Sequence, residues 1–437
     1  MKKKICLLLV FALLLGIGLG YPGYKDAEAK SKASASKVTG KVMKISKKSK
    51  LSNEKMISGY NTFSLKALKE TLNGEKEGKN VMISPASLMF ALDMASMGAN
   101  GETYTQMADI MAKGANKRDL INFAKSYRKT LAKSGMMKIA NSLWINNDNL
   151  TVNGVKVNEE YLNLLRKVFK AAAASRYFND DTKKEINNWI AKNTNDMIKN
   201  AVDDLSPKTL MLIINCLAFE GKWEVPYESY NINENGIFTN YAGEQEKAKM
   251  LSSEEMCYLS SDTAQGFLKY YEGRKYAFMA MLPDDKNIPI NDYVAGLDDD
   301  AFEKFYNSMS RQSVNTLTPA FTFDYGIKMN DMLKSLGMKL PFDPNADFFK
   351  MLDPKTISPD IVVYIGSVIQ KTHIELDENG TKAAAVTIID MKCETTAIRP
   401  EIEKKSVILN RPFAFAIMDT ETGTPVFTGV VNTVTGK

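Results

Sequence analysis

The chain has 437 residues, of which 44% are apolar and 25% charged. These values are near the average for globular proteins and exclude a wholly disordered chain. The formal net charge is +6, but the excess is confined to the N-terminal part. Residues 30–50 contain eight lysines and no acidic residue, so the chain from residue 51 onward is mildly acidic. We therefore expect no nucleic-acid partner.

The N-terminus has the pattern of a secretory signal peptide. Lysines at positions 2–4 precede an apolar run over residues 5–19, and Ala27-Glu28-Ala29 has the small-x-small form of a cleavage site. The run is short for a membrane span. We expect removal of residues 1–29 and a secreted or cell-surface protein without an integral span, and the MKKK start is typical of bacteria. An uncleaved membrane anchor is the alternative.

The next segment, residues 30–50, is rich in Lys, Ser, Ala and Gly and poor in large apolar residues. This composition predicts a flexible, solvated tail. A hypothesis for its lysines is attachment to an anionic surface, because polybasic segments are attracted to such surfaces.

From residue 51 the chain alternates helical and strand patterns without a linker rich in Pro, Gly and Ser, which predicts one domain over residues 51–437. A helical period over residues 88–97 ends at Gly98. Short apolar or alternating runs predict strands over residues 138–145, 210–219, 277–282, 362–365 and 413–418. Helices gather in the first half and strands in the second, which is typical of an α+β fold.

Cysteine and histidine usage argues against a disulfide framework, a zinc site and a triad hydrolase. If Cys6 departs with the signal, three widely spaced cysteines remain, and Cys216 lies in an apolar run that predicts burial. The single histidine, His373, falls in an alternating segment that reads as a strand. No cysteine or second histidine lies at ligand spacing, so we expect no metal, no cofactor and no enzymatic activity.

Residues 378–411 form an unusually long connection between two strands, which indicates function or disorder. Residues 381–391 contain no Gly or Pro, and the alternate positions from Thr381 to Met391 carry no charge. A strand with one buried face needs this pattern, and every N–H must be free to join a ladder. The connection therefore has the pattern of a strand that it could become.

This connection resembles the reactive-centre loop of the serpin family. Glu378-Asn379-Gly380-Thr381-Lys382-Ala383-Ala384-Ala385 is similar to the serpin hinge, and Arg411-Pro412-Phe413-Ala414-Phe415 to the segment that follows the loop. Other serpin-like positions along the chain include Asn80, Ser84, Pro85, Ser87, Asn141, Trp144, Asn187, Trp189, Asn215, Gly221, Trp223, Met250, Gly337, Phe427 and Gly429.

The resemblance implies a serpin fold, with a large central sheet, further sheets, about eight or nine helices and an exposed loop. It also implies a secreted, monomeric inhibitor of serine proteases, with cysteine proteases as a further possibility. The protease cuts the loop and is held as an acyl-enzyme while the cut loop inserts into the sheet. The hinge residues are Glu378, Gly380, Thr381, Ala383, Ala384 and Ala385.

Three positions depart from the family pattern, and one of them, Thr433, stands where a proline is common. Lys382 stands where an acidic residue is common, but by alternation it points away from the inserting face. Ser84, Ser87 and Asn215 match the buried polar residues of the serpin shutter, beneath the opening sheet, and Gln370 stands where many relatives have histidine. Because glutamine can both donate and accept hydrogen bonds, we expect the network to survive.

The usual serpin spacing from Gly380 puts the reactive bond between Glu394 and Thr395, with Cys393 and Thr396 as alternatives. A small residue before the bond favours elastase- or subtilisin-like targets, Glu394 an acid-specific protease, and Lys392 or Arg399 trypsin-like enzymes. Cys393 is either a redox-sensitive thiol or incidental. A non-inhibitory serpin that acts as a binding or chaperone-like protein is the alternative function.

Overall fold

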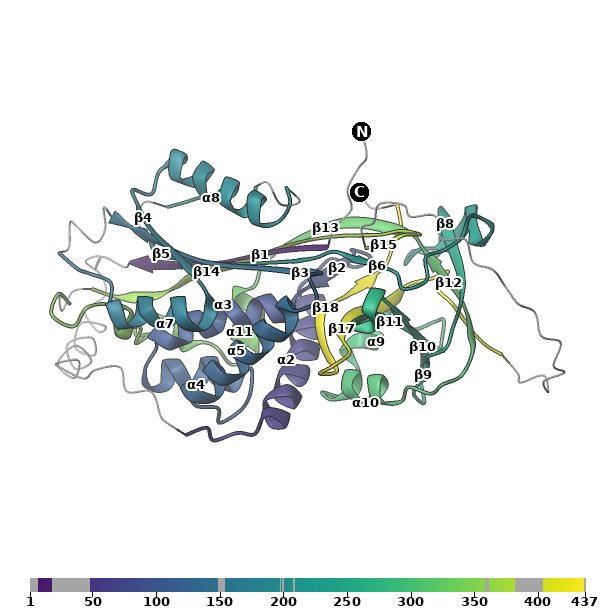
Figure 1. The fold of residues 1–437 in the computed structure, drawn as a ribbon, viewed down its shortest axis with the longest axis horizontal. Helices are drawn as coiled ribbons and strands as arrows, with labels where there is room; N and C mark the ends of the chain where they lie inside the picture. The colour runs from purple at the N-terminus through teal and green to yellow at the C-terminus, as the bar shows by residue number, and fades with distance from the viewer. Residues whose placement is uncertain are drawn as a thin grey trace.

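A six-stranded sheet, here called the main sheet, runs through the longer half of the molecule (Figure 1). The computed structural model describes residues 7–17 (backbone only), 48–147, 154–196, 198, 200–206, 209–357, 361–381 and 404–435. The strand order in the main sheet is β13 (Phe321–Lys328), β14 (Val363–Leu376), β1 (Leu7–Ile17), β5 (Thr209–Phe219), β3 (Met137–Asn146) and β4 (Ala172–Arg176).

Two smaller sheets form the other half of the molecule. The second six-stranded sheet contains β2 (Val81–Ile83), β18 (Thr424–Val431), β17 (Phe413–Asp419), β11 (Tyr276–Pro283), β10 (Ala264–Tyr270) and β9 (Tyr258–Ser260). A four-stranded sheet contains β16 (Lys405–Ile408), β12 (Val314–Pro319), β8 (Gln245–Glu255) and β7 (Ile232–Thr239). A two-stranded ribbon pairs β15 (Gly380–Thr381) with β6 (Gly221–Lys222).

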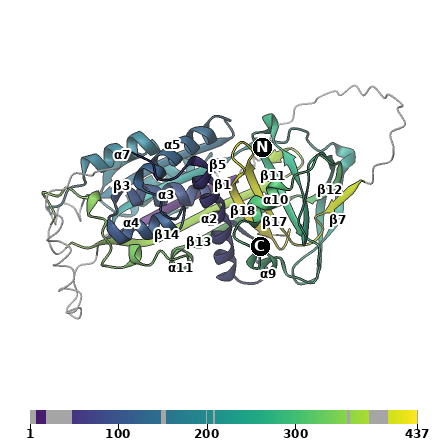
Figure 2. The ribbon, with the colours of Figure 1, turned by 90° about the horizontal axis from the view of Figure 1, so that it is seen from below.

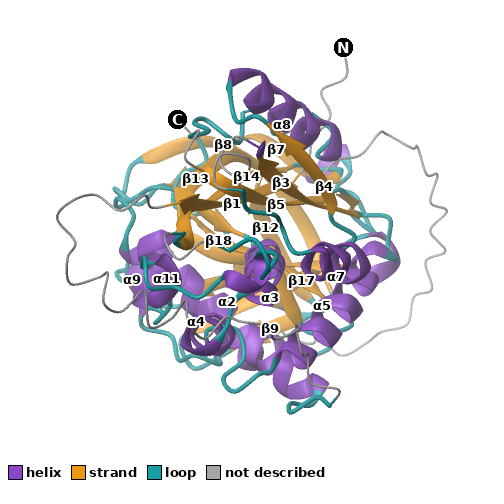
Figure 3. Ribbon diagram, turned by 90° about the vertical axis from the view of Figure 1, so that its left-hand side faces the viewer, coloured by secondary structure: helices purple, strands orange, loops and turns teal. Residues whose placement is uncertain are grey.

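Helices cover both faces of the main sheet. Helices α3, α5 and α7 cover one face of the main sheet (Figure 2), and α8 lies on the opposite face (Figure 3). The α-helices of the described residues are α2 (Asn53–Asn73), α3 (Pro85–Gly98), α4 (Gly101–Asp109), α5 (Lys117–Ala132), α7 (Glu159–Phe169), α8 (Asp180–Asn193), α9 (Ile290–Ala295), α10 (Ala301–Asn307) and α11 (Asn330–Ser335). Single 3-10 turns occur at Ser229–Asn231, Glu272–Arg274, Leu340–Phe342 and Phe349–Met351. The expected α+β class is confirmed.

Burial on both faces explains the continuous apolar run of β5. Every residue of β5 is buried, because one face packs toward α3 and the other joins a separate apolar cluster with Ile186 and Ile190 of α8. A strand covered on both sides has no solvated face that would require polar residues. Cys216 belongs to this cluster and is fully buried, as the sequence predicted.

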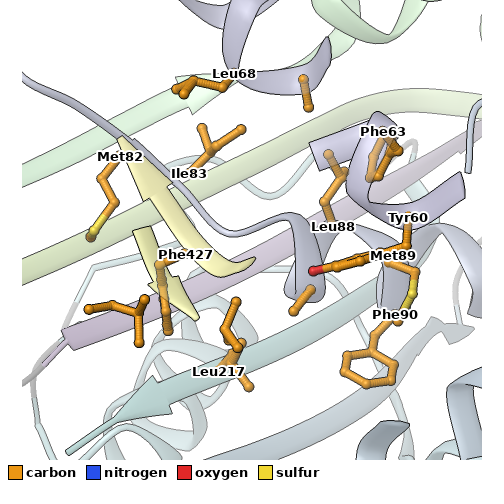
Figure 4. Close-up of a cluster of buried hydrophobic side chains, with 14 of the residues drawn as sticks. Tyr60, Phe63, Leu68, Met82, Ile83, Leu88, Met89, Phe90, Leu217 and Phe427 are labelled. Atoms are coloured by element: carbon orange, nitrogen blue, oxygen red, sulfur yellow. The ribbon is translucent and has the colours of Figure 1, made fainter. Parts of the chain in front are cut away.

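The main core lies where α2 and α3 meet the two six-stranded sheets. Figure 4 shows Phe63 of α2, Leu88 and Phe90 of α3, Leu217 of β5 and Phe427 of β18 in this region. All five are fully buried. Helix α3 is buried at every position, including its polar residues, so no face of the helix is exposed to solvent.

The predicted strands are all present, but one is much longer than its apolar run indicated. Residues 362–365 open β14, which continues to Leu376 and takes in His373. Its pattern of burial alternates from Gln370 onward, so polar side chains interrupt the apolar run without ending the strand. The predicted helix over residues 88–97 is the central part of α3, and a Cβ at Gly98 would collide with Met351.

The strand β1 lies within the apolar run predicted to be part of a signal peptide. In this structure it pairs antiparallel with both β14 and β5. Its pairing does not test cleavage, so the boundaries at residues 29 and 50 stay predictions.

Lys117 at the start of α5 carries a buried amino group. Its Nζ donates hydrogen bonds of 2.7 Å to the carbonyl oxygens of Met97 and Ala99. Burial, with a smaller repulsion from Lys350, lowers the pKa of Lys117 to about 6. An unfolded chain would hold this lysine near its ordinary value of 10.5, so between these two values the unfolded state binds more protons.

We predict that Lys117 makes the free energy of unfolding increase with pH. The free energy of unfolding of the wild type should rise relative to Lys117→Met by up to about 1.4 kcal/mol per pH unit between pH 7 and 9. Urea unfolding at several pH values measures this difference. Lys113→Met, at an exposed lysine, is the matched control, and a slope unchanged by Lys117→Met would contradict the prediction.

Candidate functional site

The chain leaves β14 through a tight turn that reverses its direction. Asp377 and Gly380 form a β-bridge, and the backbone N–H of Asn379 donates to Asp377 Oδ1 at 2.8 Å. Gly380 has a φ of +135°, and a Cβ there would meet the backbone of Gly221 and Lys222. Only glycine suits both conditions, so the glycine of the predicted hinge is required by the turn itself.

Three backbone carbonyls in this turn are held from one side. The indole Nε1 of Trp223 donates to Asp377 O at 2.9 Å, and the Trp223 backbone N–H donates to Asn379 O at 3.1 Å. The backbone N–H of Tyr227 donates to Glu378 O at 3.0 Å. These bonds fix where the connection begins.

An ion pair holds the side chain of Glu378. Its Oε2 lies 2.8 Å from Lys249 Nζ, and Glu234 lies on the same ammonium at 3.4 Å. Partial burial opposes the charge of Lys249, but the bond and the attraction of Glu378 outweigh it and raise the pKa of Lys249. The pKa of neighbouring Asp377 is raised by burial.

Thr381 is fully buried beside β6. Its hydroxyl lies 2.9 Å from the hydroxyl of Tyr271, and the Tyr271 ring stacks on Trp223 with 4.5 Å between centroids. Burial raises the pKa of Tyr271 well above its usual range, so this hydroxyl stays protonated. The small polar side chain of Thr381 is thus enclosed between β6 and the Tyr271 hydroxyl. We call Trp223, Tyr227, Lys249 and Tyr271 the hinge clamp.

The expected shutter residues meet near the middle of the main sheet. The side-chain amide of Gln370 on β14 bonds both backbone groups of Ser84, accepting from its N–H and donating to its carbonyl, each at 3.2 Å. Ser84 Oγ caps α3 by accepting from Ser87 N–H and donates to Val426 O at 2.7 Å. Gln370 therefore ties β14 to the start of α3.

The same network continues across β5 to β3. Ser87 Oγ hydrogen-bonds Asn215 Oδ1, and Asn215 Nδ2 donates to Asn141 Oδ1 at 2.7 Å. Asn141 Nδ2 then donates to Phe169 O at 2.8 Å. Asn215 and Ser87 are fully buried and Asn141 nearly so. We call Ser84, Ser87, Asn141, Asn215 and Gln370 the shutter network.

The structure brings together part of what the sequence predicted. Glu378, Gly380 and Thr381 lie in the hinge clamp, and all four expected shutter residues lie in one network. Ala383, Ala384, Ala385, Cys393, Glu394, Thr395 and Thr396 lie outside the described residues.

Sequence reasoning missed the hinge clamp and the role of Asn141. Trp223 and Asn141 carried a signal, since both matched the family pattern, but no role was assigned to them. Lys249, Tyr227 and Tyr271 carried none, because their partner Asp377–Thr381 segment is more than a hundred residues away in sequence.

The His373 ring hydrogen-bonds Asp324 on β13, with 2.7 Å between Nδ1 and Oδ1. This hydrogen bond lowers the pKa of Asp324. Within the described part of the chain, no group of three or more His, Cys, Asp and Glu side chains could hold a metal. No helix in that part is long and apolar enough to cross a membrane.

Comparisons with known proteins give one consistent match. A family model described as Serpin (serine protease inhibitor) matches residues 58–434. Human neuroserpin (Homo sapiens) is 28% identical over 376 residues, which cover 82% of this chain and 87% of neuroserpin. An uncharacterized serpin-like protein of Thermococcus kodakarensis is 28% identical over 384 residues, covering 86% of this chain and 84% of that protein.

Solved serpin structures also align with most of the chain. The crystal structure of tengpin, a thermophilic serpin, in the native state aligns with a TM-score of 0.76 and 33% identity. The alignment covers 90% of this chain and 99% of tengpin.

We predict that Ser87→Ala destabilises the protein. The substitution leaves the buried Oδ1 of Asn215 without its donor, which costs about 1–3 kcal/mol. Urea unfolding measures the loss. Thr105→Ala removes an exposed hydroxyl that bonds a carbonyl in its own helix and should cost clearly less; equal losses in the two variants would refute the role of the network.

Proposed function

Because the chain belongs to the serpin family, whose members are mostly protease inhibitors rather than enzymes, we propose that it inhibits serine proteases as a single-use substrate. The protease attacks the connection at residues 378–411 and forms an acyl-enzyme. The cut connection then inserts between β5 and β14 as a new strand. Insertion carries the attached protease away from its docking site and distorts it before deacylation.

The observation that carries this proposal is the buried position of Thr381 at the entrance to the main sheet. Thr381 already pairs with β6, and its side chain already lies in the pocket formed by Tyr271. The next residues are the small Ala383, Ala384 and Ala385, which can pass between two strands with little steric resistance. Strand addition of this kind satisfies backbone groups and buries one face of the added segment.

The shutter network supports the same proposal. It links the two strands between which the connection would insert, β5 through Asn215 and β14 through Gln370, to one end of α3. A switch needs such an element, because two packed arrangements of a core are discrete states. The network gives the arrangement seen in this structure a definite set of bonds.

For the reactive bond we propose Glu394–Thr395, with Cys393 and Thr396 as alternatives. The favoured targets are elastase- or subtilisin-like serine proteases with small or shallow pockets. Mass spectrometry of the peptide released from a trapped complex would identify the bond, and a cut outside residues 392–399 would overturn the assignment.

A denaturing gel tests the function directly. The protein is mixed with elastase-, subtilisin-, trypsin- and acid-specific serine proteases. A band at the summed mass, with loss of protease activity, is the expected result. Cleavage by every protease without such a band would favour the non-inhibitory alternative.

We predict that Thr381→Arg converts the protein from an inhibitor to a substrate. A guanidinium cannot be buried in the Thr381 pocket without losing its hydration, which costs several kcal/mol. Insertion should slow, so the ratio of cleaved protein to covalent complex should rise by at least about tenfold. Lys382→Gln, on the opposite face by alternation, is the control and should leave the ratio unchanged. Equal complex yields in all forms would contradict the prediction.

The localisation proposed is extracellular, after removal of residues 1–29. Support comes from the lysines, apolar run and cleavage pattern of the N-terminus. N-terminal sequencing of secreted protein should give Lys30 as the first residue. Deletion of residues 30–50 tests surface attachment, and unchanged retention at the cell surface would remove that hypothesis.

A further inference from the structure

The position of β1 in the main sheet is the starting point. β1 lies between β14 and β5 and is hydrogen-bonded to both (Figure 1). It pairs with β14 from Leu8 to Ile17 and with β5 from Leu7 to Gly16, antiparallel on both sides. The two strands that would receive the cut connection are therefore already bridged along most of the length of β1.

The register of β1 coincides with the register that the connection would adopt. β15 pairs Thr381 with Gly221, and the turn pairs Gly380 with Asp377. Continuing these two ladders without a bulge puts Ala383 opposite Phe219 of β5 and Ile374 of β14. β1 puts Leu7 opposite Phe219, and the next residue, Leu8, opposite His373.

The coincidence extends to the shutter. The same continuation puts Thr387 opposite Asn215 of β5 and Gln370 of β14. β1 pairs Phe11 with these same two residues. Two independent ladders, one on each side, thus lead to the same superposition of residues 383–390 on residues 7–14.

From this superposition we propose that residues 7–17 are an intramolecular plug, which holds the insertion site of the main sheet while the N-terminal segment remains attached. The plug and the inserted connection exclude each other, since each uses the same N–H and C=O groups of β5 and β14. Its removal or displacement leaves those groups available to the connection. This proposal rests on the insertion step of the proposed function.

The composition of the segment suits this role. Residues 7–17 contain no charge and no proline, so every N–H of the segment can join a ladder. The competing residues 383–390 include three alanines and Asp390, which offer less apolar area. The plug therefore withstands competition from the connection as long as both are in one chain.

The proposal is tested on the full-length chain, made by cell-free synthesis without membranes so that the N-terminus stays intact. Val10→Pro removes a ladder N–H from the middle of β1, and Val10→Ile is the matched control that keeps it. Phe11→Asp is a second disruptive variant, which introduces a charge instead of a proline. Circular dichroism establishes that each variant is folded.

The first measurement is hydrogen exchange of the backbone amides of residues 8–17, because β14 could stay protected by pairing with β5 after the plug is lost. Exchange in the wild type and Val10→Ile should be at least about tenfold slower than in Val10→Pro or Phe11→Asp. Equal exchange in all four proteins would overturn the plug, whether or not the protein is an inhibitor.

The second measurement is the yield of covalent complex with a protease that cuts the connection. The wild type and Val10→Ile should be cleaved with little complex, and the disrupted variants should form at least about tenfold more. Full complex formation by the wild type with its N-terminal segment intact would overturn the plug and leave the proposed function standing. No complex in any variant, with the expected exchange pattern, would contradict the proposed function and leave the plug standing.

Discussion

The backbone hydrogen-bonding groups on the facing edges of β5 and β14 are the constraint on which the rest of this structure depends. These two strands cannot leave a row of N–H and C=O groups inside the main sheet without partners, because each orphaned buried group costs about 1–3 kcal/mol. They must either pair with each other or accept a strand between them. In this structure β1 fills the place, and the connection after β14 is the other segment that we propose for it.

The hinge clamp holds the start of the connection that follows β14. Trp223 and Tyr227 hold three carbonyls of the turn, and Thr381 lies in its pocket against Tyr271. The start of the connection, Gly380 and Thr381, is therefore fixed beside β6 at the end of β14. Alignment of this kind removes much of the conformational entropy that an unanchored segment would lose on joining the sheet.

The shutter network ties β5 and β14 to the start of α3 at the middle of the main sheet. Its side chains are buried, so each bond is strong and each loss is expensive in the low dielectric of the core. Gln370 supplies both a donor and an acceptor to the backbone of Ser84. The departure from the family pattern at this position therefore has a structural role.

The sequence by itself determined the α+β class, the places of the main strands, the family and the hinge pattern around Gly380. These follow from local causes: the periodicity of apolar residues, the turn that only glycine permits, and the absence of proline in a segment that must pair. Tertiary structure alone decided which groups meet the hinge. Tyr271 and Lys249 reach Thr381 and Glu378 across more than a hundred residues, and no local pattern encodes such a distance. It also decided that an apolar N-terminal run lies as a strand between β5 and β14, because apolarity predicts burial, whereas the partner depends on which backbone groups the folded sheet leaves unpaired.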